Sequence, residues 1–375
     1  MANLLKNIFS GLSRGRHTDK NSAIGVDIGT SAIKVVEIRK KNGKAVLETY
    51  GAIALGPYSG SEAGRVASLP VEKSAEALKE VLSQSGVVGS ELAMSIPIQS
   101  SLIFTLELPA QVHPDEIASI VPTEARKYIP VPIGEVSIDY FILPKKEASF
   151  EELATPSSSE VPTEKLNVLV VATQNDAVSK YRSIVSLCGL SAPFFEIEIF
   201  SSIRSNFEHE LSPVLLMDFG ASRTKLTLVE FGMVKSYHTI DRGGADITNS
   251  ISKSMSITFT EAEKMKKDFG LLGNPAEKSL ADTIKLHIDY IFSETNNVLL
   301  GYEKKYGRTI SKIIFTGGGA LLKGLPEVAA NNFPVEIEVG HPFSKVGAPR
   351  FLEKVLATMG PEFAVALGLA LRKLQ

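Results

Sequence analysis

Apolar and polar positions divide this chain into segments with strand-like and helix-like spacing. Over residues 22–55, apolar runs flank a Lys-Asn-Gly-Lys turn, a pattern that predicts strands joined by tight turns. Over 70–86, apolar residues recur with helical spacing between Pro70 and Gly86, which predicts a helix. The short apolar segment 91–97 then predicts another strand. Strands and helices in this order are typical of an α/β domain.

The pattern changes between residues 98 and 174. Here the order strand, helix, strand, strand predicts a small α+β subdomain inserted in the surrounding fold. Residues 145–165 within it are acidic, rich in Ser and Pro and without a hydrophobic period, so we expect a mobile loop. Residues 1–21 form a basic tail with apolar residues on one helical face. We expect a weak peripheral contact of this tail with an anionic membrane surface, a frayed chain end, or a helix packed on the body of the protein.

A weak internal repeat connects two distant parts of the chain. The segment IGVDIGTSAIKVVEI at 24–38 returns as PVLLMDFGASRTKLTLVEFG at 213–232. Each copy reads as an apolar run, Asp-x-Gly, a hydroxyl, a basic residue and a second apolar strand. Two such hairpins are either ordinary turns or the facing walls of a phosphate site. Because both copies are present, we expect two half-domains that face one another across a cleft.

The residue types in these hairpins suit a phosphate group and a magnesium ion. Glycine lets the backbone approach a ligand closely, and hydroxyl, amide and ammonium groups donate to phosphate oxygens. Magnesium keeps several waters and takes few carboxylates, so one aspartate from each hairpin is expected to hold Mg²⁺ through its waters. The candidates are Gly29, Thr30, Ser31 and Lys34 in the first hairpin, Gly220, Ser222 and Thr224 in the second, and Asp27 and Asp218 for the metal.

Two further glycine-rich turns follow in the second part of the chain. Gly317, Gly318 and Gly319 stand between a predicted strand and a predicted helix, where bare backbone can approach a flat ligand. Gly243 and Gly244 offer a second close approach. In the helix that follows, Glu261 and Lys264 are spaced i and i+3. They form either an ordinary surface ion pair or a contact to a ribose and base.

Composition removes several classes of function. A chain of 375 residues is long enough for two or more domains. Its formal charge of −2 argues against a general nucleic-acid binder. Cys188 is the one cysteine, which excludes a disulfide framework within the chain and argues against a cysteine-rich metal site. No run reaches the roughly 18 uncharged apolar residues of a membrane span.

The order of these motifs resembles the actin-like ATPase superfamily over residues 22–375. The resemblance implies an α/β fold with two duplicated half-domains around a nucleotide cleft that binds ATP and Mg²⁺. The first half would comprise 22–97, 175–212 and 360–375, and the second 213–359. Asp27, Gly29, Thr30, Ser31 and Lys34 would form the first phosphate loop, and Asp218, Gly220, Ser222 and Thr224 the second. Gly243, Gly244, Glu261, Lys264 and Gly317 to Gly319 would surround the nucleoside.

Within the superfamily, TEARKYIPVPIGEVSIDYFIL and PFSKVGAPRFLEKVLATMGPEFAVALGLALR resemble the PilM family of type IV pilus assembly. That resemblance implies a cytoplasmic ATP-binding adaptor at the inner membrane. It would dock the cytoplasmic N-terminal segment of a PilN-like inner-membrane protein, partly through 98–142, and link it to the assembly ATPase. Bound nucleotide would shift the population between open and closed states.

Two alternatives stay open at this point. An FtsA-like division protein would polymerise at the membrane through a terminal amphipathic helix, which we do not find at the C-terminus and find only hinted at the N-terminus. A member of the sugar-kinase branch would need a catalytic base for a substrate hydroxyl. The second loop carries Ala221 and Arg223 where many relatives have glycine and threonine. No residue identifies itself as the one that positions a hydrolytic water, so we expect ATP binding with slow hydrolysis.

Overall fold

The computed structural model describes residues 21–109, 111–143, 165–208, 210, 212–273 and 278–374. Nearly all of the predicted basic tail, up to residue 20, and of the predicted loop, residues 145–164, lie outside these ranges. The chain divides into two compact units. One comprises Met1–Ser95 and Arg182–Gln375, and the other comprises Ile96–Tyr181.

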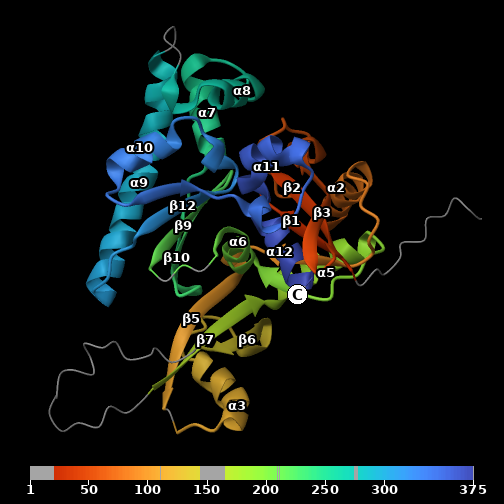
Figure 1. Cartoon of the computed structure of the whole chain (residues 1–375), viewed down its shortest axis with the longest axis vertical. Coiled ribbons are helices and arrows are strands. Elements are labelled where there is room, and N and C mark those ends of the chain that lie inside the picture. The colour runs from red at the N-terminus through yellow and green to blue at the C-terminus, as the bar shows by residue number, and fades with distance from the viewer. Residues whose placement is uncertain are drawn as a thin grey trace, which may run out of the picture. The chain divides into compact units, whose positions relative to one another are not determined.

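The first sheet of the larger unit has the strand order β3-β2-β1-β4-β8. Figure 1 labels its strands β1, β2 and β3. Its strands are β1 (Ser22–Ile28), β2 (Ala32–Lys41), β3 (Lys44–Ala54), β4 (Leu92–Ile96) and β8 (Phe195–Ile197). β1 is antiparallel to β2 and parallel to β4. Helix α2 (Val71–Gln84) buries Leu78, Val81 and Leu82, the apolar stripe that predicted this helix.

The second sheet repeats this arrangement position by position. Its strands are β9 (Val214–Phe219), β10 (Thr224–Glu230), β11 (Met233–Ile240), β12 (Lys312–Thr316) and β13 (Glu336–Val339), in the order β11-β10-β9-β12-β13. β9 is antiparallel to β10 and parallel to β12. The weak sequence repeat therefore corresponds to two sheets of equal topology, and the expected duplication of half-domains is confirmed.

Helices lie between the later strands of the second sheet in the chain order. They are α7 (Gly244–Met255), α8 (Phe259–Phe269), α9 (Lys278–Tyr306) and α10 (Leu325–Asn332). Apolar side chains of this sheet and of these helices form one large core, which includes Phe292, Phe315 and Phe333. Phe292 meets the ring of Phe333 edge to face, with 4.9 Å between ring centroids.

Two helices pack closely through glycine in the larger unit. They are α6 (Glu198–Asn206) and α12 (Ala364–Leu374). A Cβ atom at Gly368 of α12 would overlap the carbonyl oxygen of Ser201 in α6. A Cβ atom at Gly25 would likewise overlap backbone of α12. The absence of these side chains lets α12 lie directly against both α6 and β1.

The C-terminal stretch Arg350–Leu374 is long and apolar enough to span a membrane by length and composition alone. It is divided among the short 3₁₀ helices η7 (Arg350–Leu352) and η8 (Gly360–Phe363) and the helices α11 (Glu353–Met359) and α12, and 61% of its apolar window is buried. Helix α12 buries every residue from Ala364 to Ala370. These features are those of a core helix in a globular unit.

The smaller unit holds a three-stranded antiparallel sheet with the order β5-β7-β6. Its elements are β5 (Ser101–Pro109), α3 (Pro114–Ala125), β6 (Val136–Ile142) and β7 (Lys165–Gln174), and α5 (Asn175–Leu187) follows. Alternate strand residues meet Ile117, Val121 and Ala125 of α3 in a core of their own. On β6, Tyr140 packs toward that core, and Phe141, next in sequence, is 62% exposed.

Candidate functional site

The two Asp-x-Gly hairpins have the same geometry. In the first turn the Gly29 amide donates to the Ala32 carbonyl at 3.0 Å, and in the second the Gly220 amide donates to the Arg223 carbonyl at 2.9 Å. Both turns begin where β1 or β9 ends. In each ladder the aspartate lies opposite a lysine seven residues later, so that Asp27 pairs with Lys34 and Asp218 with Lys225. Sequence analysis selected Lys34 and missed Lys225.

The first turn is held by backbone hydrogen bonds and leaves a charged group accessible. The carbonyls of Thr30 and Ser31 accept from the amides of Ala67 and Leu55 at 2.8 and 2.9 Å. Thr30 is exposed and Ser31 is half-buried. Lys34 is half-buried and forms no ion pair with another residue that the structure describes. An exposed turn beside an uncommitted ammonium group suits a phosphate.

Asp27 of the first hairpin is almost buried. Its side chain belongs to a residue that is 8% exposed, and Oδ1 accepts a hydrogen bond from Ser95 Oγ at 2.8 Å. Ser95 is near the end of β4, the parallel neighbour of β1. The sheet itself therefore fixes this carboxylate at the carboxyl end of two adjacent strands.

The second hairpin uses its lysine differently. Lys225 Nζ lies 3.0 Å from Asp218 Oδ2 and 2.6 Å from Glu198 Oε2. Glu198 is the first residue of α6. The three side chains are 16%, 17% and 10% exposed for Lys225, Asp218 and Glu198. We call the carboxylates of Asp27, Asp218 and Glu198, which surround the ammonium of Lys225, the carboxylate cluster.

The charges in the carboxylate cluster act on one another. Burial opposes the charge of Lys225, but Asp218 and Glu198 outweigh it and raise the pKa of Lys225 well above its usual range. Burial is the main cause that raises the pKa of Glu198, and the charges of Asp218 and Asp27 add to it. Asp27 influences both groups, so the structure brings the first hairpin's carboxylate close to the second hairpin's ion pairs.

Both glycine-rich turns pack against the second hairpin. The Gly244 amide donates to the Gly220 carbonyl at 3.0 Å. A Cβ atom at Gly243 would overlap the backbone of Ala221. A Cβ atom at Gly317, where φ is +80°, would overlap the Asp218 carboxylate, and one at Gly319 would overlap the ring of Phe219. The structure thus assembles Gly243, Gly244, Gly317, Gly318 and Gly319 around this hairpin, and Gly318 is exposed.

The hydroxyls of the second turn are not equivalent. Thr224 is fully buried, and its Oγ1 donates to the Arg242 carbonyl at 2.9 Å. This hydroxyl therefore holds the turn before α7 and is not available as the expected phosphate donor. Ser222 is half-buried within the turn.

The structure does not bring Glu261 and Lys264 to the Gly243–Gly244 turn. Both are exposed, and Glu261 accepts from the amide and hydroxyl of Thr258 at 2.9 and 2.8 Å in the capping box of α8. The turn is approached instead by Lys266, whose Nζ donates to the Gly244 carbonyl at 2.9 Å and to Glu263 at 2.7 Å.

Glu263 and Lys266 are the pair that faces inward. Lys266 also donates to Thr248 Oγ1 at 2.8 Å. Burial lowers the pKa of Lys266. For Glu263, burial works in the opposite direction, but the ammonium of Lys266 outweighs it and lowers the pKa of the carboxyl. A second Glu-x-x-Lys pair, two residues after Glu261 and Lys264, therefore provides the polar side chains beside the Gly243–Gly244 turn.

The carboxylates of this site do not form a direct ligand set for a magnesium ion, and the expected contact through the waters of the ion stays a prediction. Asp27 and Asp218 are the residues expected to hold Mg²⁺ through its waters. Among the residues that the structure describes, no three His, Cys, Asp or Glu side chains gather closely enough to hold a metal ion. Asp27 Oδ1 faces Ser95, and Asp218 and Glu198 face the ammonium of Lys225. A divalent ion between Asp218 and Glu198 would compete with that ammonium for the same oxygens.

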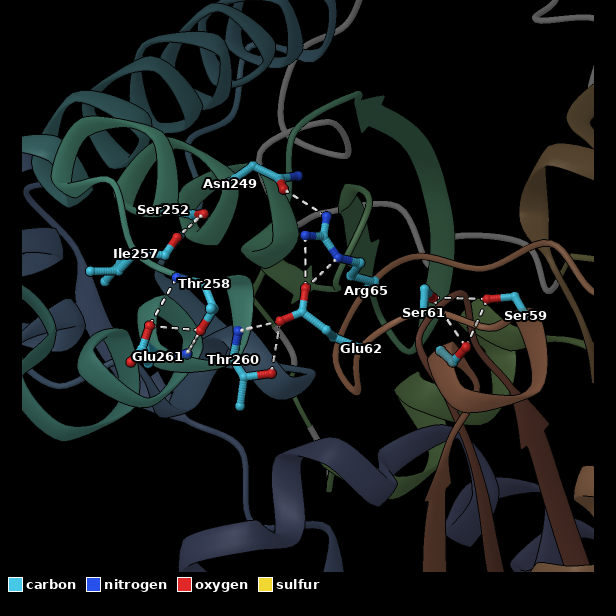
Figure 2. A network of polar contacts seen from close by, with 11 residues as sticks. Ser59, Ser61, Glu62, Arg65, Asn249, Ser252, Ile257, Thr258, Thr260 and Glu261 are labelled. Carbon is cyan, nitrogen blue, oxygen red and sulfur yellow. Dashed lines mark hydrogen bonds and ion pairs between the residues drawn. The ribbon is translucent and has the colours of Figure 1, made fainter.

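A polar network joins the loop after β3 to the start of α8 (Figure 2). Glu62 Oε1 accepts from the amide and hydroxyl of Thr260 at 3.1 and 3.0 Å. Arg65 donates to Glu62 at 2.9 Å and to Asn249 at 3.4 Å, and its guanidinium lies 4.3 Å from the centroid of Phe259. We call these five residues the clasp.

The clasp connects the two halves of the larger unit near the first phosphate turn. The carboxylate of Glu62 satisfies a free amide at the N-terminus of α8, where negative charge is favoured. The hydrogen bonds from Arg65 are the main cause that lowers the pKa of Glu62. The loop that carries the clasp also supplies the amides that hold Thr30 and Ser31.

Comparison with known proteins identifies relatives across the whole chain. The family model of the type IV pilus assembly protein PilM matches residues 25–374. A solved PilM–PilN type IV pilus biogenesis complex contains a chain of 26% identity with a TM-score of 0.76, over 94% of this chain and 98% of that chain. The ethanolamine utilization protein EutJ from Carboxydothermus hydrogenoformans shares the fold, with 16% identity, a TM-score of 0.51 and coverage of 93% and 89%.

Among curated proteins, this chain is similar to the cell division protein FtsA of several bacteria. The FtsA of Staphylococcus epidermidis is 23% identical over 378 residues, which cover 92% of this chain and 77% of the relative. The FtsA of Neisseria meningitidis is 26% identical over 230 residues, or 54% of this chain and 53% of the relative. Together with the paired sheets, these relatives confirm an actin-like ATPase fold.

Proposed function

This chain belongs to the PilM family of type IV pilus assembly proteins, and we propose that it is an ATP-binding cytoplasmic adaptor of that assembly. The observation that carries the nucleotide part is the pair of equal Asp-x-Gly hairpins, brought together in one unit so that the charges of both aspartates act on Glu198. Two phosphate turns with two glycine turns beside them form the walls that a nucleotide requires.

The proposed roles differ between residues. The backbone of Gly29 to Ser31 and the ammonium of Lys34 bind phosphate oxygens. Gly220 and Ser222 bind them from the second hairpin. The exposed turn at Gly318 and the inward pair Glu263 and Lys266 hold the nucleoside. Thr224, Glu261 and Lys264, which sequence analysis included, have no direct ligand role in this proposal.

Titration calorimetry with ATP tests the nucleotide part. We expect saturable one-to-one binding, and we expect Lys34→Met to weaken it about tenfold through loss of a charge-assisted contact. Lys40→Met, which removes an exposed lysine from the far end of the same strand, is the matched control and should bind as the parent protein does. Absence of binding by a folded parent protein would refute this part.

The adaptor part rests on the match to a PilM–PilN complex. We propose that the chain docks the cytoplasmic N-terminal segment of a PilN-like inner-membrane protein and so acts at the cytoplasmic face of the inner membrane, as a link to the pilus assembly ATPase. Within the smaller unit, Phe141 presents an exposed ring on the sheet face opposite the α3 core. Exposed aromatic side chains are favoured anchors for a peptide partner.

A peptide titration tests the adaptor part. The cell holds this protein with ATP, and the syringe holds a synthetic peptide of the PilN-like N-terminus from the same organism. We expect one-to-one binding that Phe141→Ala weakens about tenfold or more, as loss of a hot-spot aromatic does. Phe351→Ala is the matched control, because Phe351 is 81% exposed in the larger unit. No binding of the peptide by ATP-loaded protein would refute the adaptor role and leave the nucleotide part unaffected.

Nucleotide is proposed to regulate docking by a shift between open and closed arrangements of the two halves. The FtsA-like alternative is not favoured, since the PilM model covers residues 25–374 and the curated FtsA relatives are distant. The comparisons and the site give the sugar-kinase alternative no support.

A further inference from the structure

The two hairpins have the same register, but their lysines have different ionic partners. Lys34 and Lys225 occupy equivalent register positions opposite Asp27 and Asp218. Lys34 has no ion pair with the described part of the chain, whereas Lys225 bridges two carboxylates at 3.0 and 2.6 Å. The difference comes from Glu198, which α6 brings to the second hairpin and for which the first hairpin has no counterpart in the ion pairs of the described residues.

The ammonium of Lys225 lies between carboxylates, where a bound metal cation would otherwise lie. Its ammonium contacts one oxygen each of Asp218 and Glu198, and Asp27 lies close enough to raise its pKa further. Three carboxylates without a cation in this buried place would repel one another strongly. In a typical magnesium site the metal and its waters provide this neutralisation. Here a side chain of the protein provides a large part of it.

We propose that Lys225 is a built-in cation of the nucleotide site, so that this chain binds ATP with little dependence on Mg²⁺. The inference rests on the proposed nucleotide binding, and it replaces the magnesium role expected for Asp27 and Asp218. The ammonium keeps the carboxylate cluster from repelling the phosphates, and Lys34 adds a second positive charge at the first turn. A lysine brings one positive charge where magnesium brings two, which also fits a site that binds ATP and turns it over slowly.

The first experiment compares ATP affinity in magnesium and in EDTA by calorimetry. For the parent protein we expect the two dissociation constants to agree within about threefold, which is about 0.7 kcal/mol. For Lys225→Met we expect binding in EDTA to be at least about tenfold weaker than in magnesium, since the uncovered carboxylates then need an added cation. Lys34→Met, at the equivalent position of the first hairpin, should weaken ATP by a similar factor in both buffers.

The second experiment needs no nucleotide. Magnesium chloride is titrated against the ATP-free protein while its melting temperature is recorded. The parent protein should show no stabilisation. Lys225→Met should be stabilised, because a ligand that binds the folded state raises the melting temperature. The double variant Lys225→Met with Glu198→Gln should lose this response, and it also guards against a single variant too unstable to fold.

The outcomes are distinguishable. ATP binding that is lost at least tenfold in EDTA by the parent protein would overturn the inference and leave the proposed function in place. A magnesium response that is equal in the single and double variants would also overturn it, because the ion would then bind elsewhere. Failure of the folded parent protein to bind ATP in either buffer would refute the proposed nucleotide function and this inference together.

Discussion

The carboxylate of Glu196 on β8 forms ion pairs with an arginine of α6 and an arginine of α12, and so links the two helices to the sheet. Its side chain is 5% exposed, and its carboxylate accepts from Arg204 of α6 at 2.7 and 2.8 Å and from Arg372 of α12 at 2.6 Å. Ser201 of α6 also donates to it. Burial opposes its charge, but the bonds from Arg204 outweigh burial and lower the pKa of Glu196.

Glu196→Gln keeps the shape of the side chain and removes the charge. Removal of one partner from a buried ion pair costs about 3–5 kcal/mol in general. The side chains of Arg204 and Arg372 are 24% and 43% exposed, so the guanidinium groups that remain still reach water. We therefore expect a loss of about 2–3 kcal/mol in the free energy of unfolding, at or just below the lower limit of that range.

Urea unfolding at neutral pH measures this loss. Asp289→Asn is the matched control, because it breaks an exposed ion pair with Lys285 and should cost less than about 0.5 kcal/mol. The pH dependence gives a second readout. Because the folded pKa of Glu196 lies below its ordinary value of 4.5, its contribution is complete above pH 4.5 and is lost as pH falls through the folded pKa. A difference between parent and variant below about 1 kcal/mol at pH 7 would refute the reasoning.

Three further predictions follow, the first two with a matched control variant. Gly368→Ala should lower the free energy of unfolding by about 1–3 kcal/mol in urea, because its Cβ meets backbone of α6. Gly301→Ala, in an open position of α9, should instead raise it by up to about 1 kcal/mol. Lys266→Met should weaken ATP in calorimetry at least about tenfold, and Lys264→Met should leave it unchanged. Glu62→Gln removes the negative charge of the clasp and should speed the release of a fluorescent ATP analogue in stopped flow. An unchanged rate would show that the clasp has no role in nucleotide retention.

Much of the fold follows from local signals in the sequence. The apolar run, Asp-x-Gly and basic residue occur in both hairpins, and the structure gives both the same turn and the same register. Strand alternation and the stripe of α2 likewise depend on neighbours a few residues apart. Such features are predictable because the sequence period alone determines which side of an element is buried.

The placement of Glu261 and Lys264 away from the Gly243–Gly244 turn has a physical cause. Two Glu-x-x-Lys pairs overlap there, Glu261 with Lys264 and Glu263 with Lys266, and spacing cannot choose between them. Thr258 followed by Glu261 is a capping-box pattern, and this signal assigns Glu261 to the helix end. A helix turns by about 100° per residue, so a displacement of two residues moves the pair to another face. The capping-box pattern therefore indicates that Glu261 lies at the end of α8, and it leaves Glu263 and Lys266 as the pair that can lie beside the Gly243–Gly244 turn.

Of the two residues that form the second hairpin's ion pair, Lys225 could be predicted from the sequence and Glu198 could not. Lys225 was recoverable, since it follows Asp218 at the same distance that Lys34 follows Asp27. Glu198 was not, because it stands after a short strand, two residues beyond Glu196, and gains its role only when α6 begins beside the second hairpin. One tertiary contact thus makes two equal hairpins unequal: it leaves the first lysine free for a ligand and commits the second to the protein's own carboxylates.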